Sequence, residues 1–267
     1  MELRIGTSGW HYKHWLGRYY PAGLKPAEML DWYARDFDTV ELNNTFYHLP
    51  KETSLDTWRS STPASFLFAV KGSRFITHMI KLKDAARGLG NFLPLAKRLG
   101  RKLGPILWQL PPGWNVNLER LEEFLRELPR GHRYAFELRN QSWMTDKVYE
   151  LLQKYDAAFC IYELAGYHSP FEITASWTYV RLHGPTTSKY AGSYSDAQLA
   201  AWAKRIDGWR AAMKAVYVYF DNDDSAYAVD NALTLKRLTR SSRAARAPRA
   251  HREASIRLAH AASCASL

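Results

Sequence analysis

The sequence predicts a single (β/α)8 barrel, a TIM-like ring of eight parallel strands with helices outside. Short β-type runs alternate with helix-type runs along almost the whole chain, which is the pattern of a parallel sheet covered by helices. Eight alternations favour a closed barrel over a doubly wound sheet, and no Gly-x-Gly-x-x-Gly motif follows the first strand. A length of 267 residues also suits one barrel.

The expected strands are short runs rich in apolar, β-branched and aromatic residues. In chain order they are Leu3–Gly6, Thr39–Asn43, Phe66–Lys71, Pro105–Gln109, Tyr134–Arg139, Ala157–Tyr162, Thr178–His183 and Val216–Phe220.

The segments between these strands have helical periodicity. In two of them apolar residues recur at i, i+3, i+4 and i+7, as on one face of a helix. These residues are Leu121, Phe124, Leu125 and Leu128, then Val148, Leu151, Leu152 and Tyr155. Ser195 and Gln198 form a capping box at the start of a further helix, and Pro26 suits the first turn of another.

The composition is that of a globular protein, with 46% hydrophobic and 24% charged residues. No apolar run approaches the roughly 18 residues needed to span a bilayer, so we expect no membrane association. The chain runs from Met1 directly into a strand, which leaves no signal peptide, and it has only two cysteines. A cytoplasmic protein is expected.

The net charge of +11 is unevenly distributed along the chain. Residues 239–267 hold six arginines and one glutamate among Ala and Ser, with too few apolar residues to pack. We therefore expect a barrel domain over residues 1–238 and a disordered basic tail over 239–267. A basic surface hints at an anionic partner, although a solvated positive surface is the simpler explanation.

Polar residues break the apolar pattern of the expected strands in a regular way. Within each strand they alternate with apolar residues, so the apolar set faces the helices and the polar set faces the barrel axis. The residues of this polar set are Glu41, Asn43, Lys71, Gln109, Glu137, Arg139, Arg181 and His183. They gather at the carboxyl ends of five strands, the end at which barrel active sites are built.

This set suits an anionic small-molecule substrate. Arg139 and Arg181 would hold the anion, and Glu41 or Glu137 would move a proton. Three cations, with Lys71 included, exceed these two carboxylates, which predicts a surplus of positive charge for an anion to neutralise.

Two further residues and one loop extend the catalytic set. His183 is a second acid–base candidate, and Lys71 could act as a Schiff-base nucleophile because burial beside cations lowers an amine's pKa. The loop over residues 184–194 offers hydroxyls, Lys189 and Gly192 just before a helix start, where barrels frequently hold phosphate.

Aromatic residues that follow or end strands are expected to wall this pocket and to hold a base or a ring. They are Trp10, Phe46, Tyr47, Trp114, Trp143 and Tyr162.

Other interpretations of the same residues stay open. Glu41 and Glu137 could belong to a structural ion-pair network with Arg4 or the strand-end cations, because buried charges must be paired. A metal site is possible but not favoured, since only His183 among the histidines ends a strand. The two glutamates also resemble a glycosidase pair, although the neighbouring cations do not suit a neutral sugar. The sequence does not identify a cofactor.

The motifs along the chain show a family resemblance. They are the runs 6–10, 41–47, 68–71, 103–112, 136–143, 179–184 and 218–223. In this order they resemble the DUF72 (YecE-like) family of uncharacterised proteins, which implies a TIM-barrel-like fold. The resemblance implies a candidate site of Trp10, Glu41, Asn43, Lys71, Gln109, Glu137, Arg139, Arg181, His183 and Asn222. Asp221 is left out because many members have Asn there, and the tail after Leu238 departs from the pattern.

Three functional hypotheses follow. The first is an enzyme, such as a hydrolase, lyase or isomerase, that acts on a phosphorylated or otherwise anionic small molecule by Glu/His acid–base chemistry. The second is a nucleic-acid-binding or DNA-repair barrel similar to endonuclease IV, which rests on fold-level analogy alone. The third is a barrel that binds a metabolite without turnover.

Overall fold

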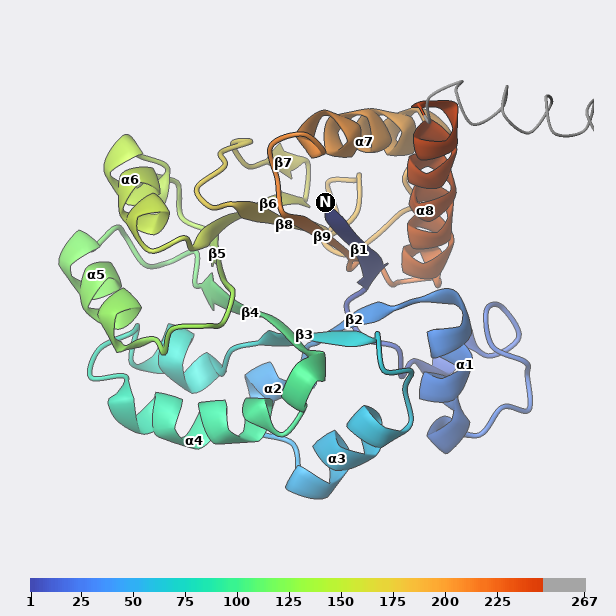
Figure 1. The fold of residues 1–267 in the computed structure, drawn as a ribbon, viewed down its shortest axis with the longest axis horizontal. Coiled ribbons are helices and arrows are strands. Elements are labelled where there is room, and N and C mark those ends of the chain that lie inside the picture. The colour runs from blue at the N-terminus through green and yellow to red at the C-terminus, as the bar shows by residue number, and fades with distance from the viewer. Residues whose placement is uncertain (247–267) are drawn as a thin grey trace, which may run out of the picture.

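The computed structural model describes residues 1–246, with side chains to residue 241, and shows a (β/α)8 barrel (Figure 1). The parallel strands are hydrogen-bonded in the order β1-β9-β8-β6-β5-β4-β3-β2. Helices surround this ring, and α7 packs beside α8. The predicted fold class is therefore confirmed.

The strands lie close to the predicted runs. They are β1 (Glu2–Thr7), β2 (Thr39–Leu42), β3 (Leu67–Lys71), β4 (Leu103–Leu110), β5 (Tyr134–Leu138), β6 (Ala158–Leu164), β8 (Trp177–Leu182) and β9 (Ala215–Phe220). A two-residue strand, β7 (Tyr167–His168), pairs antiparallel with β6 and was not predicted.

The main helices of the described chain are α1 (Met29–Asp36), α2 (Asn44–Tyr47), α3 (Glu52–Ser60), α4 (Ala86–Lys97), α5 (Leu118–Glu127), α6 (Asp146–Lys154), α7 (Asp196–Trp209) and α8 (Tyr227–Arg246). A π-helical turn, Phe75–Met79, precedes α4, and short 3-10 turns occupy Lys13–Trp15, Pro26–Glu28, Gly100–Lys102 and Gln141–Trp143. Among the described helices, none has both the length and the apolar composition to cross a membrane.

The end of the barrel domain differs from the sequence-based expectation. Helix α8 continues through Leu238 to Arg246, so the boundary drawn at residue 238 falls inside a helix. Thr239 is buried, and its hydroxyl donates to the Leu235 carbonyl oxygen within that helix. The rest of the predicted tail, residues 247–267, lies outside the described residues.

Two apolar clusters fill the described barrel, as the strand period of two requires. The larger lies between strands and helices and includes Val40, Phe136 and Val180. The smaller fills the barrel interior and consists of Ala69, Leu107, Ala135, Ala158, Cys160, Trp177, Tyr179, Ala215, Tyr217 and Tyr219. Polar residues of the same phase follow these interior residues towards the carboxyl ends of the strands, which form the end called the mouth below.

The ring is closed at the seam between β1 and β2, where only a single bridge, Ser8 to Glu41, joins the two strands. A Cβ on Gly6 would lie 2.4 Å from the Thr39 carbonyl oxygen, so only glycine allows this approach. The buried Tyr33 hydroxyl of α1 completes the seam. It accepts from the Thr7 backbone N–H at 3.0 Å and donates to the Thr39 carbonyl oxygen at 3.1 Å.

Tyr33→Phe should therefore destabilise the barrel by about 1–3 kcal/mol, because it leaves buried backbone groups at the seam without partners. Tyr19→Phe is the matched control, since Tyr19 packs in the same aromatic cluster but its hydroxyl bonds the exposed carboxylate of Asp36. Urea unfolding of both variants measures the difference. Equal stability of the two variants would show that the seam does not depend on Tyr33.

Candidate functional site

A single arginine lies at the centre of the mouth. Arg181, on β8, is fully buried and its guanidinium contacts three carboxylates from other strand ends. The Nη2–Glu41 Oε1 and Nη1–Glu137 Oε2 distances are both 2.7 Å, and Nη2 lies 3.0 Å from Asp221 Oδ2. Nε also donates to Glu41, and Nη1 lies 3.2 Å from His183 Nε2, so the five N–H groups of Arg181 all have acceptors within the protein.

The carboxylates of the two predicted glutamates, Glu41 and Glu137, are likewise occupied by contacts within the protein. Glu41 also accepts from the Ser8 hydroxyl at 2.5 Å and from the Tyr179 hydroxyl at 2.6 Å. Glu137 pairs with Arg139 Nε as well as with Arg181. Burial alone would raise the pKa of Glu137, but the charges of Arg139 and Arg181 outweigh burial and hold that pKa well below its usual range. Both carboxylates therefore serve first to neutralise Arg181.

This geometry corrects the role expected for Arg181. The N–H groups of this buried guanidinium face the three carboxylates and His183 Nε2, which leaves none directed at a substrate anion. Arg139 is better placed, because its side chain is 11% exposed and only Nε pairs with a carboxylate.

Asp221 belongs to this network although the sequence analysis left it out. It follows β9 directly, and its Oδ2 lies 3.0 Å from both Arg181 Nη2 and His183 Nδ1. Burial would raise the pKa of Asp221, but Arg181 and His183 lower it. With Asp221, three carboxylates face the three predicted cations, so the predicted surplus of positive charge across the mouth is absent. Position at a strand end was the signal that could have identified it.

Charge remains unbalanced at one corner of the mouth, around Lys71 at the end of β3. Its side chain is nine-tenths buried, yet Nζ has no hydrogen bond or ion pair with the described part of the chain. Nζ lies 4.3 Å from the ring centroid of Phe46. Burial, and then the charge of Arg181, lower the pKa of Lys71 to about 8, against the opposing pull of the carboxylates.

A neutral histidine lies beside this lysine. His78 comes from the π-helical turn Phe75–Met79, and its ring packs against Phe46. Burial, followed by the charges of Lys71, Arg74 and Arg139, lowers the pKa of His78 to about 4. The sequence analysis missed His78 and Arg74, because irregular turns have no periodicity to reveal them. Lys71, Arg74 and Arg139, together with His78, form what we call the basic corner.

The remaining predicted residues lie around the network rather than within it. Gln109 on β4 is buried in register with Glu137. Asn222 does not contact Arg181. It donates instead to the Gly192 carbonyl oxygen and to Asn231, and so anchors the loop before α7 to α8. That loop brings the Tyr190 ring to 5.4 Å from the His183 ring, over the mouth.

The predicted aromatic residues are only partly gathered at the mouth. Trp114 and Trp143 pack against each other in the core, and the Tyr162 hydroxyl donates to the Leu138 carbonyl oxygen. Phe46 lies beneath Lys71, and Tyr47 is exposed.

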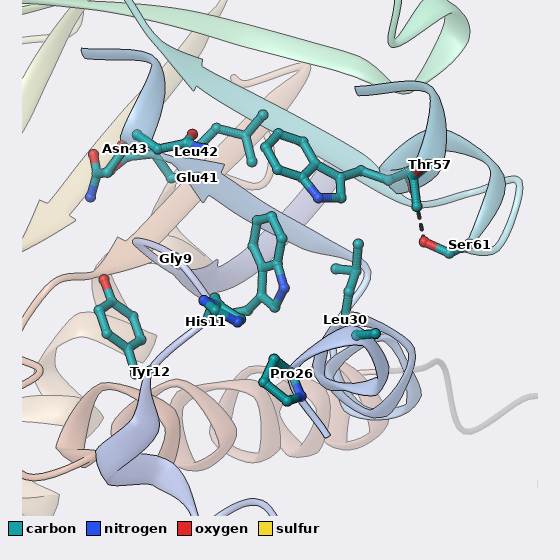
Figure 2. Close-up of a pocket in the computed structure, with 14 residues that line it drawn as sticks. Gly9, His11, Tyr12, Pro26, Leu30, Glu41, Leu42, Asn43, Thr57 and Ser61 are labelled. Atoms are coloured by element: carbon teal, nitrogen blue, oxygen red, sulfur yellow. Dashed lines mark hydrogen bonds between the residues drawn. The ribbon is translucent and has the colours of Figure 1, made fainter. Parts of the chain in front are cut away.

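Trp10 and Asn43 line a cavity of about 580 Å³ beside the mouth (Figure 2). It lies between the loop after β1, the start of α1, the end of β2 and α3. Trp58 of α3, which the sequence analysis did not single out, faces Trp10 with ring centroids 5.2 Å apart.

No group of three or more His, Cys, Asp or Glu side chains within residues 1–246 is arranged to hold a metal ion. In the network, the guanidinium of Arg181 lies between the three carboxylates.

Comparisons with known proteins converge on one family. A family model described as "Protein of unknown function DUF72" matches residues 4–254, which extends beyond Leu238. UPF0759 protein YunF of Bacillus subtilis is 26% identical over 86% of this chain and 92% of its own length. UPF0759 protein YecE of Escherichia coli is 31% identical over 52% of this chain, and the match spans about half of YecE, 48%.

A solved structure supports the same relationship. The crystal structure of a DUF72 family protein from Thermotoga maritima matches with a TM-score of 0.82 and 28% identity, over 89% of this chain and 99% of the other.

Removal of Arg181 should leave Glu41 without its cation and weaken the charge pairing of Glu137 and Asp221. We expect Arg181→Gln to lose about 3–5 kcal/mol of stability at pH 8, the usual consequence of breaking a buried ion pair. The loss should shrink at pH 5, because carboxylates without their cation are protonated more easily and then tolerate burial. Chemical denaturation at both pH values measures this.

Arg126→Gln is the control for this experiment, since it removes a surface i,i+4 pair with Glu122. It should leave the unfolding midpoint essentially unchanged at either pH. A small, pH-independent loss for Arg181→Gln would contradict the network as described.

Proposed function

The chain belongs to the DUF72 family, and we propose that the mouth of its barrel is the active site of an enzyme for a small anionic substrate. Lys71 is the observation that supports this proposal. A largely buried lysine without a direct ion-pair partner is costly, and shifted groups of this kind gather at functional sites. The barrel mouth is also the usual place for catalysis in this fold.

The surroundings of Lys71 define what it would bind. Burial, and then the charges of Lys71, Arg74 and Arg139, lower the pKa of His78, which is consistent with three cations near this ring. A phosphate or carboxylate in the basic corner would supply negative charge there. The terminal nitrogens of Arg139 could contact it, because their contacts with the Tyr190 hydroxyl and His183 Nε2 are long, at 3.5 Å.

The same geometry assigns a role to each part of the site. With a pKa near 8, Lys71 is partly neutral at physiological pH and can accept or donate a proton at the bound substrate. His78, held neutral, can donate or accept a hydrogen bond without adding charge. Glu41, Glu137 and Asp221 position Arg181, whose charge adds to the effect of burial in lowering the pKa of Lys71.

Anion binding tests the proposal. Calorimetric titration with inorganic phosphate, ribose 5-phosphate and citrate should detect binding of at least one. Lys71→Met should weaken it tenfold or more, the scale of one lost charge-assisted contact of about 1.5–3 kcal/mol. Lys97→Met, on the exposed face of α4, should have no effect.

Two results would count against the enzyme proposal. One is a native protein that binds none of these anions, or binds them equally well after Lys71→Met. The other is tighter binding of duplex DNA that weakens steeply with salt, which would favour the nucleic-acid hypothesis instead.

Stability offers an independent check on Lys71. Its folded-state pKa of about 8 lies below the ordinary 10.5, so the charged form destabilises the fold and wild-type stability rises as pH passes from 8 to 10.5. Lys71→Met, which keeps the unbranched stem, should therefore melt at a higher temperature than wild type at pH 7. The difference should disappear near pH 10.5.

Scanning calorimetry of both proteins across this pH range measures the effect. A variant that melts below wild type at pH 7 would mean that the fold stabilises the Lys71 ammonium, which removes the reason to regard it as functional.

A further inference from the structure

The cavity beside the mouth differs in chemistry from the basic corner. Its walls are largely aromatic and aliphatic, from Trp10, Trp58, Leu30 and Pro26, and Trp10 and Trp58 meet edge to face (Figure 2). Glu41 borders it, but its carboxylate is buried and fully engaged by Arg181, Ser8 and Tyr179. A cavity of this kind and size suits an uncharged ring system rather than an anion.

The cavity is held open by contacts behind its walls. The Trp10 carbonyl oxygen accepts from the buried Tyr20 hydroxyl at 2.6 Å, and the Tyr12 hydroxyl donates to the Ser8 carbonyl oxygen at 2.6 Å. Gly9 has a φ of +94° and lies against the Tyr12 ring, where a Cβ would come within 2.7 Å of the Tyr12 hydroxyl. These walls therefore exist before a ligand binds, which reduces the entropy cost of binding.

Helix α2 connects the cavity to the basic corner. It starts at Asn44, which lines the cavity, and its Phe46 ring lies beneath Lys71. The Thr45 hydroxyl donates to the Lys71 carbonyl oxygen at 2.6 Å, so this single turn is fixed to the end of β3. One helical turn rises only about 5 Å, so a small molecule can reach both places.

We infer that the cavity binds a planar aromatic or heteroaromatic ring, joined by a short linker to the anionic group held at the basic corner. This substrate class rests on the proposed function of the mouth. Trp10 and Trp58 enclose the ring, and Lys71 with Arg139 holds the anion.

Indole tests the ring part, because it is an uncharged planar ring. Ligand-observed NMR titration should show indole binding to the native protein with a millimolar Kd or tighter. Trp58→Leu should weaken indole at least fivefold, as loss of an aromatic stacking partner does. Trp209→Leu, a half-buried tryptophan at the end of α7, should change nothing.

Indole-3-acetate tests the link between the two parts. It should bind more tightly than indole, and Lys71→Met should remove this gain while leaving indole itself unaffected. Absence of indole binding, or binding insensitive to Trp58→Leu, would overturn the ring assignment even if phosphate binds at Lys71. Trp58-dependent indole binding with no Lys71 dependence of indole-3-acetate would overturn the joined substrate. Absence of phosphate binding as well would then reject the proposed function.

Discussion

The fold and the site both depend on the buried guanidinium of Arg181. It joins β8 to carboxylates that follow or end β2, β5 and β9, so four of the eight strand ends meet at one cation. A buried ion pair adds little net stability compared with apolar packing, but one left incomplete is strongly destabilising. Strand ends that shifted out of register would leave a charge unpaired. The network therefore specifies the register of the mouth more than it adds to overall stability.

The N–H donors of Arg181 are occupied by contacts within the protein, so other groups at the mouth must carry out any chemistry. All three carboxylates contact the guanidinium of Arg181, so their negative charge offsets positive charge at the centre of the mouth. Lys71 lies outside that centre and receives no direct partner among the described residues, although the carboxylates pull its pKa upward from a distance. The same arrangement that balances the total charge thus leaves a local excess of positive potential at β3, beside Arg74 and Arg139.

The sequence was enough to predict the barrel, its eight strands and the side of each strand that faces the axis, because a period of two is visible within one strand. It could not predict which inward charges pair, since pairing depends on the barrel geometry that brings distant strand ends together. Arg181 was assigned to the substrate for this reason, and Asp221 was excluded by a family pattern although it completes the network. His78 and Trp58 lie on a π-helical turn and on an outer helix, where no strand alternation marks them.

There is a physical reason for a fixed charged group, Arg181, to lie beside groups that have no partner within the described protein. Electrostatic catalysis requires charges that are already fixed before the substrate arrives, since water or flexible side chains would otherwise reorganise during the reaction. Arg181 cannot move without leaving carboxylates unpaired, so the charges of this network are fixed before a substrate arrives, and burial followed by Arg181 keeps the pKa of Lys71 low. Lys71 and the Asn43 oxygen, in contrast, lack partners within the described protein. Groups that a fold leaves without partners, next to groups it satisfies completely, are those with which a ligand can interact, and Lys71 at the end of β3 is such a group.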